Sequence, residues 1–135
     1  MCVLSLGKGE IYSKSTKQKI NTKISTESEL VSVDDLTPQV LWTKYFLKNQ
    51  GYETNGTVIY QDNKSAILLE TNGHWSKGKR SKHISIRYFF IKDRVQEGEL
   101  SINWCPSEDM IGDYFTKPLQ GQKFIKFRDL IMNNQ

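Results

Sequence analysis

The sequence predicts an α/β fold built of α+β layers, in which a mixed β-sheet is flanked by helices. Its 135 residues, 37% of them apolar, suit one domain over residues 1–135 with a core of its own. Short β-prone runs alternate along the chain with two long stretches of helical periodicity. The later β-prone runs are joined through helical stretches, which favours parallel pairing of those strands.

The N-terminal part predicts an antiparallel hairpin. Residues 2–6 and 11–15 are short β-prone runs, and the loop 7–10 between them contains two glycines. A polar stretch follows over residues 16–25.

Residues 26–50 predict the longest helix, with Gly51 as its stop. Pro38 lacks an amide donor, so we expect a kink or a break near Leu36 and Thr37. Apolar residues recur at helical spacing at Leu30, Val33, Leu36, Val40, Leu41 and Leu47.

The middle of the chain predicts a strand that leads into a helix. Residues 57–61 are rich in β-branched and aromatic side chains, and Asp62 or Asn63 can cap a helix that runs from residue 64 to about residue 71. Residues 72–82 then form a polar loop with four basic side chains.

The C-terminal third predicts one helix, one strand and two shorter helical pieces. Helical periodicity over residues 84–97 ends at Gly98, and a strand over 100–105 ends before Pro106. We expect helical pieces at 108–115 and 124–132.

Charge and composition favour an intracellular protein with an anionic partner. The net charge is +4 and the pI is about 9.0, which permits nucleic acid without demanding it. Cys2 and Cys105 are too few for a disulfide framework. We expect no secretion signal and no membrane partner, because no apolar stretch approaches the roughly 20 residues of a membrane helix. The cytoplasm and the nucleus are not distinguished.

Three carboxylates stand at junctions between predicted elements. They are Glu29 at the start of the long helix, Asp62 at the end of the middle strand, and Asp113 near the C-terminus. Acids that converge at strand and helix ends are typical of sites for hard divalent cations. Each also has a structural interpretation: Glu29 in a capping box with Thr26, Asp62 as a helix N-cap, and Asp113 as a solvated acid.

Four motifs carry a family resemblance. They are STESEL at 25–30, YQDNKSA at 60–66, KHISIRYFFI at 82–91 and DYFTKPL at 113–119. In this order, over nearly the whole chain, they resemble the RNase H region at the carboxyl end of the Pol polyprotein of copia-type LTR retrotransposons. The resemblance implies an RNase H fold with a five-stranded mixed sheet, which cleaves the RNA strand of an RNA–DNA hybrid. It also implies two Mg²⁺ ions held by four carboxylates, with Mn²⁺ as a substitute.

The resemblance implies that Glu29, Asp62 and Asp113 are catalytic and bind the metal. The family's first metal-binding Asp lies on a strand upstream of the hairpin, at the centre of the sheet. We therefore expect an RNase H domain truncated at its N-terminus. Glu10 stands at the wrong place in the motif order to replace that Asp.

Basic residues are the candidates for contact with nucleic acid. Phosphate contacts are expected from Lys77, Lys79, Arg80, Lys82 and Lys117. The alternative for the loop 77–82 is a solvated surface, and for Lys117 it is a plain surface lysine. We expect His83 to orient the start of its helix, and the tryptophans Trp42, Trp75 and Trp104 to lie in or near the core.

The first hypothesis is a truncated ribonuclease H that is weak or inactive, with an RNA–DNA hybrid and the reverse transcriptase portion of the same polyprotein as partners. The alternative is a noncatalytic remnant that binds nucleic acid or serves polyprotein assembly. A third is an unexpressed relic or a gene model with misplaced bounds. The sequence leaves the oligomeric state open.

Overall fold

The computed structural model describes residues 2–15, 25–67 and 82–134. The chain divides into two compact units, one made of Met1–Lys19 with Pro106–Gln135 and the other of Ile20–Cys105. We call them unit 1 and unit 2. The fold is mixed α/β, with small sheets and flanking helices, and is compatible with an RNase H-like fold. The prediction of a single domain over residues 1–135 stays a prediction, because the structure defines each unit separately and not their relation.

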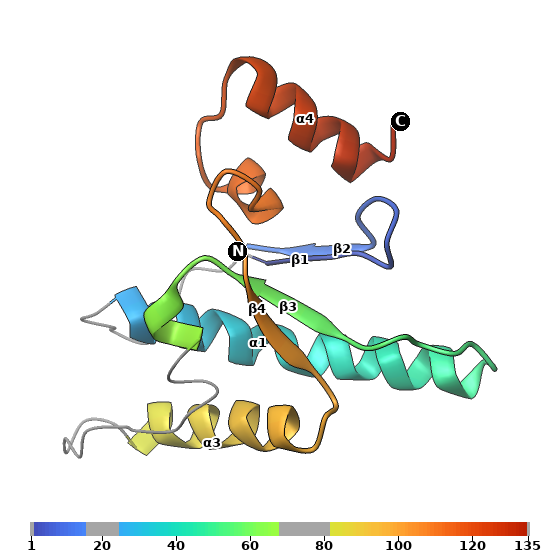
Figure 1. The fold of residues 1–135 in the computed structure, drawn as a ribbon, viewed down its shortest axis with the longest axis vertical. Coiled ribbons are helices and arrows are strands. Elements are labelled where there is room, and N and C mark those ends of the chain that lie inside the picture. The colour runs from blue at the N-terminus through green and yellow to red at the C-terminus, as the bar shows by residue number, and fades with distance from the viewer. Residues whose placement is uncertain (1, 16–24, 68–81, 135) are drawn as a thin grey trace. The chain divides into compact units, whose positions relative to one another are not determined.

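Unit 2 contains a parallel strand pair and two long helices (Figure 1). Strand β3 (Val58–Gln61) pairs with β4 (Ser101–Trp104), in register from Val58 with Ser101 to Gln61 with Trp104. The helices are α1 (Ser25–Asn49) and α3 (Lys82–Gln96). The predicted parallel pairing and the predicted strand before Asp62 are both confirmed.

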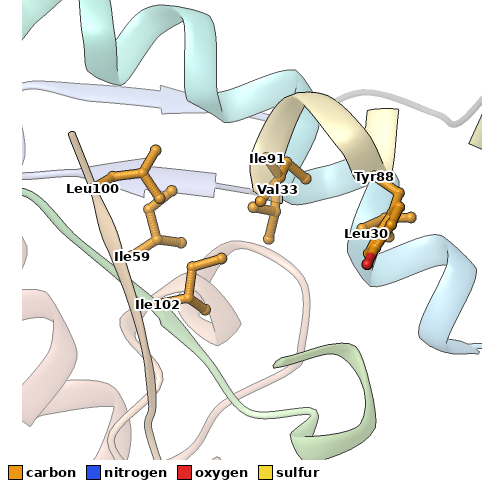
Figure 2. Packing of buried hydrophobic residues seen from close by; sticks show 7 residues of the cluster. All are labelled: Leu30, Val33, Ile59, Tyr88, Ile91, Leu100 and Ile102. Atoms are coloured by element: carbon orange, nitrogen blue, oxygen red, sulfur yellow. The ribbon is translucent and has the colours of Figure 1, made fainter. Parts of the chain in front are cut away.

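The core of unit 2 joins both helices to one face of this strand pair. Tyr88 and Ile91 of α3 lie together with the α1 side chains, as Figure 2 shows. The seven buried members of the cluster are Leu30, Val33, Ile59, Tyr88, Ile91, Leu100 and Ile102. Arg87 of α3 adds ion pairs to Asp34 at 2.8 Å and Asp35 at 2.7 Å on α1. The strands and helices that carry Glu29 and Asp62 therefore share one core.

Helix α1 continues through Pro38, so the predicted break is wrong. Proline removes one amide donor. Pro38 itself is exposed, however, and the helical turns before and after it bury apolar residues. Thr37 is fully buried, and its hydroxyl donates to the carbonyl of Val33 at 2.7 Å. Burial of Val33 and Val40 keeps the two halves of the helix against the core despite the lost hydrogen bond.

Unit 1 contains the predicted hairpin and two helical pieces. Strands β1 (Cys2–Leu4) and β2 (Tyr12–Lys14) pair antiparallel, which confirms the hairpin. The 3₁₀ helix η1 (Ile111–Phe115) is shorter than the predicted piece, and α4 (Gly121–Met132) begins three residues earlier than expected.

The hairpin tip contacts the end of α4. The amide of Glu10 donates to the carbonyl of Ile131 at 3.1 Å. Gly9 adopts φ +67°, and a Cβ atom there would lie 3.2 Å from both the Ile131 oxygen and the Asn133 Cβ. Glycine is therefore required at this position by both backbone conformation and space.

The described strands form two separate two-stranded sheets, one antiparallel and one parallel. The five-stranded sheet that the resemblance implies stays a prediction, because the two sheets belong to different units. No helix in the described part of the chain combines the length and the apolar character needed to cross a membrane.

Candidate functional site

Asp62 follows β3 directly, at the carboxyl end of the parallel strand pair. This is the end of an open α/β sheet at which sites are built. The next residue, Asn63, caps the helix that begins at residue 64, because its side-chain oxygen accepts hydrogen bonds from the amides of Ser65 at 3.0 Å and Ala66 at 3.2 Å. Asn63, and not Asp62, is therefore the N-cap of this helix.

Glu29 lies in the second turn of α1, half-buried, next to the fully buried Leu30. Thr26 is itself helical, and the residues that precede Ser25 lie outside the described part of the chain. The capping-box interpretation of Glu29 therefore stays a prediction.

Glu29 and Asp62 flank the same hydrophobic cluster. Leu30 and Ile59 both belong to it, and Ile67 of the short helix after Asp62 packs against it. Leu30, next to Glu29, and Ile59, three residues before Asp62, thus contribute to one core.

Asp113 lies in η1 and is buried, with 8% of the residue exposed. Its carboxylate forms an ion pair with the Lys117 ammonium, with 2.7 Å between Oδ2 and Nζ. The backbone supports this pair, because the Asp113 carbonyl accepts from the amides of Thr116 at 3.1 Å and Lys117 at 2.9 Å. The solvated-acid interpretation of Asp113 is wrong.

The donor chemistry of these residues fits a hard divalent cation. All three are carboxylates, the ligand type that Mg²⁺ uses, and the Lys117 ammonium already provides a positive charge at one of them. Within residues 2–15, 25–67 and 82–134, no group of three or more His, Cys, Asp or Glu side chains is arranged to hold a metal ion. A centre with all three acids stays a prediction, since Asp113 belongs to unit 1 and the others to unit 2.

Most of the predicted basic contacts are not described by the structure. Lys77, Lys79 and Arg80 lie outside the described residues. Lys82 is the first residue of α3 and not part of the loop as predicted. Lys117 is the one member of this predicted set whose side-chain partner is defined in the described part of the chain.

The carboxyl end of the strand pair also holds a contact that the sequence did not reveal. The Lys64 ammonium lies 4.5 Å from the centre of the Trp104 ring. Trp104 is half-exposed and Trp42 is largely exposed, so the prediction that these two lie in the core is wrong. The pairing of Trp104 with Gln61, one residue before Asp62, becomes visible only once the strand register is known.

Fold and site together define an α/β protein with carboxylates at the carboxyl end of a parallel strand pair and in a buried turn. The chain is 35% identical over 130 residues to the retrovirus-related Pol polyprotein from transposon RE1 of Arabidopsis thaliana. It is 34% identical over 126 residues to the corresponding polyprotein from transposon RE2 of the same plant. It is 29% identical over 123 residues to that from transposon TNT 1-94 of Nicotiana tabacum.

These matches cover 96%, 93% and 91% of this chain, but only 9%, 8% and 9% of the relatives. The chain therefore spans less than a tenth of the length of the curated relatives it matches. No family model matches it, and no solved structure matches it. Its homologues are retrovirus-related Pol polyproteins from transposons, which supports a region of a retrotransposon-derived polyprotein.

Proposed function

We propose that this chain is the RNase H region of a copia-type retrotransposon Pol polyprotein. Its reaction is metal-dependent cleavage of the RNA strand of an RNA–DNA hybrid. The observation that carries the proposal is the position of Asp62, which ends a parallel strand and leaves the helix cap to Asn63. Similarity to Pol polyproteins over more than nine tenths of the chain supports it.

The proposed catalytic residues are Glu29, Asp62 and Asp113, whose carboxylates would hold Mg²⁺, with Mn²⁺ as a substitute. When bound, the metal activates water and stabilises the charge on the leaving oxygen. The chain's part is to hold the acids in fixed positions. Strand β3 and the core beneath α1 do so for Asp62 and Glu29, and the η1 turn does so for Asp113.

The proposed substrate is recognised by shape, through its phosphates and 2′-hydroxyl groups, and not by base sequence. The basic residues Lys77, Lys79, Arg80, Lys82 and Lys117 are proposed to contact its phosphates. The proposed protein partner is the reverse transcriptase portion of the same polyprotein.

A noncatalytic nucleic-acid-binding role is the second candidate. One observation favours it: an oxygen of the Asp113 carboxylate is already engaged by the Lys117 ammonium. In this case the chain binds a hybrid in a salt-sensitive way and does not cleave it.

Cleavage of a labelled RNA–DNA hybrid in Mg²⁺ and in Mn²⁺ separates the two candidates. The chain is compared with Asp62→Asn and with Asp93→Asn, which removes an exposed carboxylate from α3 of the same unit. Metal-dependent cleavage that Asp62→Asn abolishes and Asp93→Asn retains supports the ribonuclease. Hybrid binding without cleavage in all three proteins, and also in a longer Pol fragment that contains the chain, supports the second candidate.

A further inference from the structure

The Asp113–Lys117 ion pair joins a buried acid to a solvent-accessible base. The Asp113 side chain is 11% exposed and the Lys117 side chain 54%, at a separation of 2.7 Å. A buried carboxylate needs a counter-charge, since burial without one is costly. Here the counter-charge reaches the acid from the solvent side.

The backbone of η1 fixes the spacing of this pair. Residues four apart lie on the same side of a helical turn, and the carbonyl of Asp113 accepts the amide of Lys117 at 2.9 Å. The chain then turns at Pro118, with the Leu119 amide 2.8 Å from the Lys117 carbonyl. The backbone of Lys117 is therefore held through both its amide and its carbonyl.

A second lysine pair in the same unit offers a direct comparison. Lys126 and Asp109 are also 2.7 Å apart, and the Lys126 side chain is likewise 54% exposed. The Asp109 side chain, however, is 56% exposed, so water solvates that carboxylate without help. The two pairs differ mainly in the burial of the acid.

We propose that Lys117 is a resident counter-ion of Asp113, which a divalent cation replaces, and that the displaced ammonium then contacts a phosphate of the nucleic acid. The first part requires only that Asp113 binds a divalent cation, and the second rests on the proposed function. A lysine ammonium is a compact point charge on a flexible stem, and it lacks the bidentate grip of arginine. It holds one oxygen of Asp113, which makes it exchangeable.

This exchange gives Lys117 two successive partners of the same charge. Divalent ions of the Mg²⁺ type bind through one or two carboxylates together with substrate phosphates. A cation bound to the Asp113 carboxylate repels the ammonium held at Oδ2, so binding of the cation weakens the ion pair. An ammonium released next to a bound phosphate keeps a negative partner, and Asp113 keeps a positive one.

Binding of Mn²⁺ alone, followed by the electron paramagnetic resonance signal of the free ion, tests the competition. Lys117→Met is expected to bind Mn²⁺ about two- to fivefold more tightly than the wild type, the scale of a solvent-accessible ion pair. Lys126→Met, which removes the same charge from the matched pair, leaves the affinity unchanged. Lys117→Arg, which keeps the charge and can hold both carboxylate oxygens, gains no affinity. Adding Asp113→Asn to Lys117→Met abolishes the gain.

Equal Mn²⁺ affinity in the wild type and Lys117→Met would overturn the exchange, and so would an equal gain in Lys117→Met and Lys126→Met. Circular dichroism and thermal unfolding establish that each variant is folded, and Lys117→Gln replaces Lys117→Met if that variant is not. Hybrid binding in Ca²⁺ is expected to weaken in Lys117→Met, and unchanged binding would overturn the phosphate contact. Absence of cleavage by a longer Pol fragment that contains the chain would overturn the proposed ribonuclease while a Mn²⁺ shift stands, and cleavage without the shift would overturn only the exchange.

Discussion

Replacing Asn63 by alanine tests whether Asn63, and not Asp62, starts the helix after β3. The Asn63 side-chain oxygen accepts two amide hydrogen bonds, from Ser65 at 3.0 Å and from Ala66 at 3.2 Å. Loss of such a cap costs about 1 kcal/mol, within a range of about 0.5–2 kcal/mol. We therefore expect Asn63→Ala to lower the free energy of unfolding by about 1 kcal/mol, measured by urea unfolding.

Asn63→Asp is the matched control, because aspartate caps helices about as well as asparagine. It should restore most of the stability that Asn63→Ala loses. Asp62→Ala should cost less than Asn63→Ala, since Asp62 does not occupy the N-cap position. A silent Asn63→Ala together with a destabilising Asp62→Ala would refute the reasoning and return Asp62 to a structural role.

Three further predictions concern stability. Leu30→Ala removes a fully buried side chain next to Glu29, and should cost about 2–5 kcal/mol in urea unfolding. Gly9→Ala should lower the melting temperature more than Gly121→Ala. Both glycines have φ near +65°, but only at Gly9 would a Cβ atom lie 3.2 Å from other atoms, the Ile131 oxygen and the Asn133 Cβ. Equal losses of melting temperature would contradict this. The Tyr45 hydroxyl, and then Arg94, hold the pKa of Glu99 below its ordinary value. These contacts therefore stabilise the folded protein above about pH 4.5, and this stabilisation is lost as the pH falls through the lowered pKa. When the free energy of unfolding is measured against pH, Glu99→Gln should lack this acid-dependent loss.

The secondary structure could largely be predicted because local patterns determine it. A run of β-branched and aromatic residues located β3, helical periodicity located α1, and the glycine-containing loop located the hairpin. The break at Pro38 was wrongly expected because the local rule counts one lost amide bond and cannot include the burial of Val33 and Val40. Tertiary packing decided that element.

The sequence predicted which residues belong to the candidate site, but not which groups their side chains contact. The sequence pointed to Asp62 and Asp113, but it could not choose between Asp62 and Asn63 as the cap, since both residue types suit that position. It assigned Lys117 to a phosphate, whereas the structure places its ammonium on Asp113. An i, i+4 spacing permits such an ion pair. The burial of Asp113, which makes a counter-charge necessary, becomes visible only in three dimensions.

Cleavage of an RNA–DNA hybrid, compared with an RNA duplex of the same sequence, tests the central claim most directly. Since the chain spans less than a tenth of its relatives, it is assayed beside a longer Pol fragment that contains it. The account predicts that the longer fragment cleaves the hybrid alone, in a Mg²⁺- or Mn²⁺-dependent way, and that Asp62→Asn abolishes this cleavage. A longer fragment that leaves the hybrid intact, or one that cleaves it equally well with Asp62→Asn, would contradict the account.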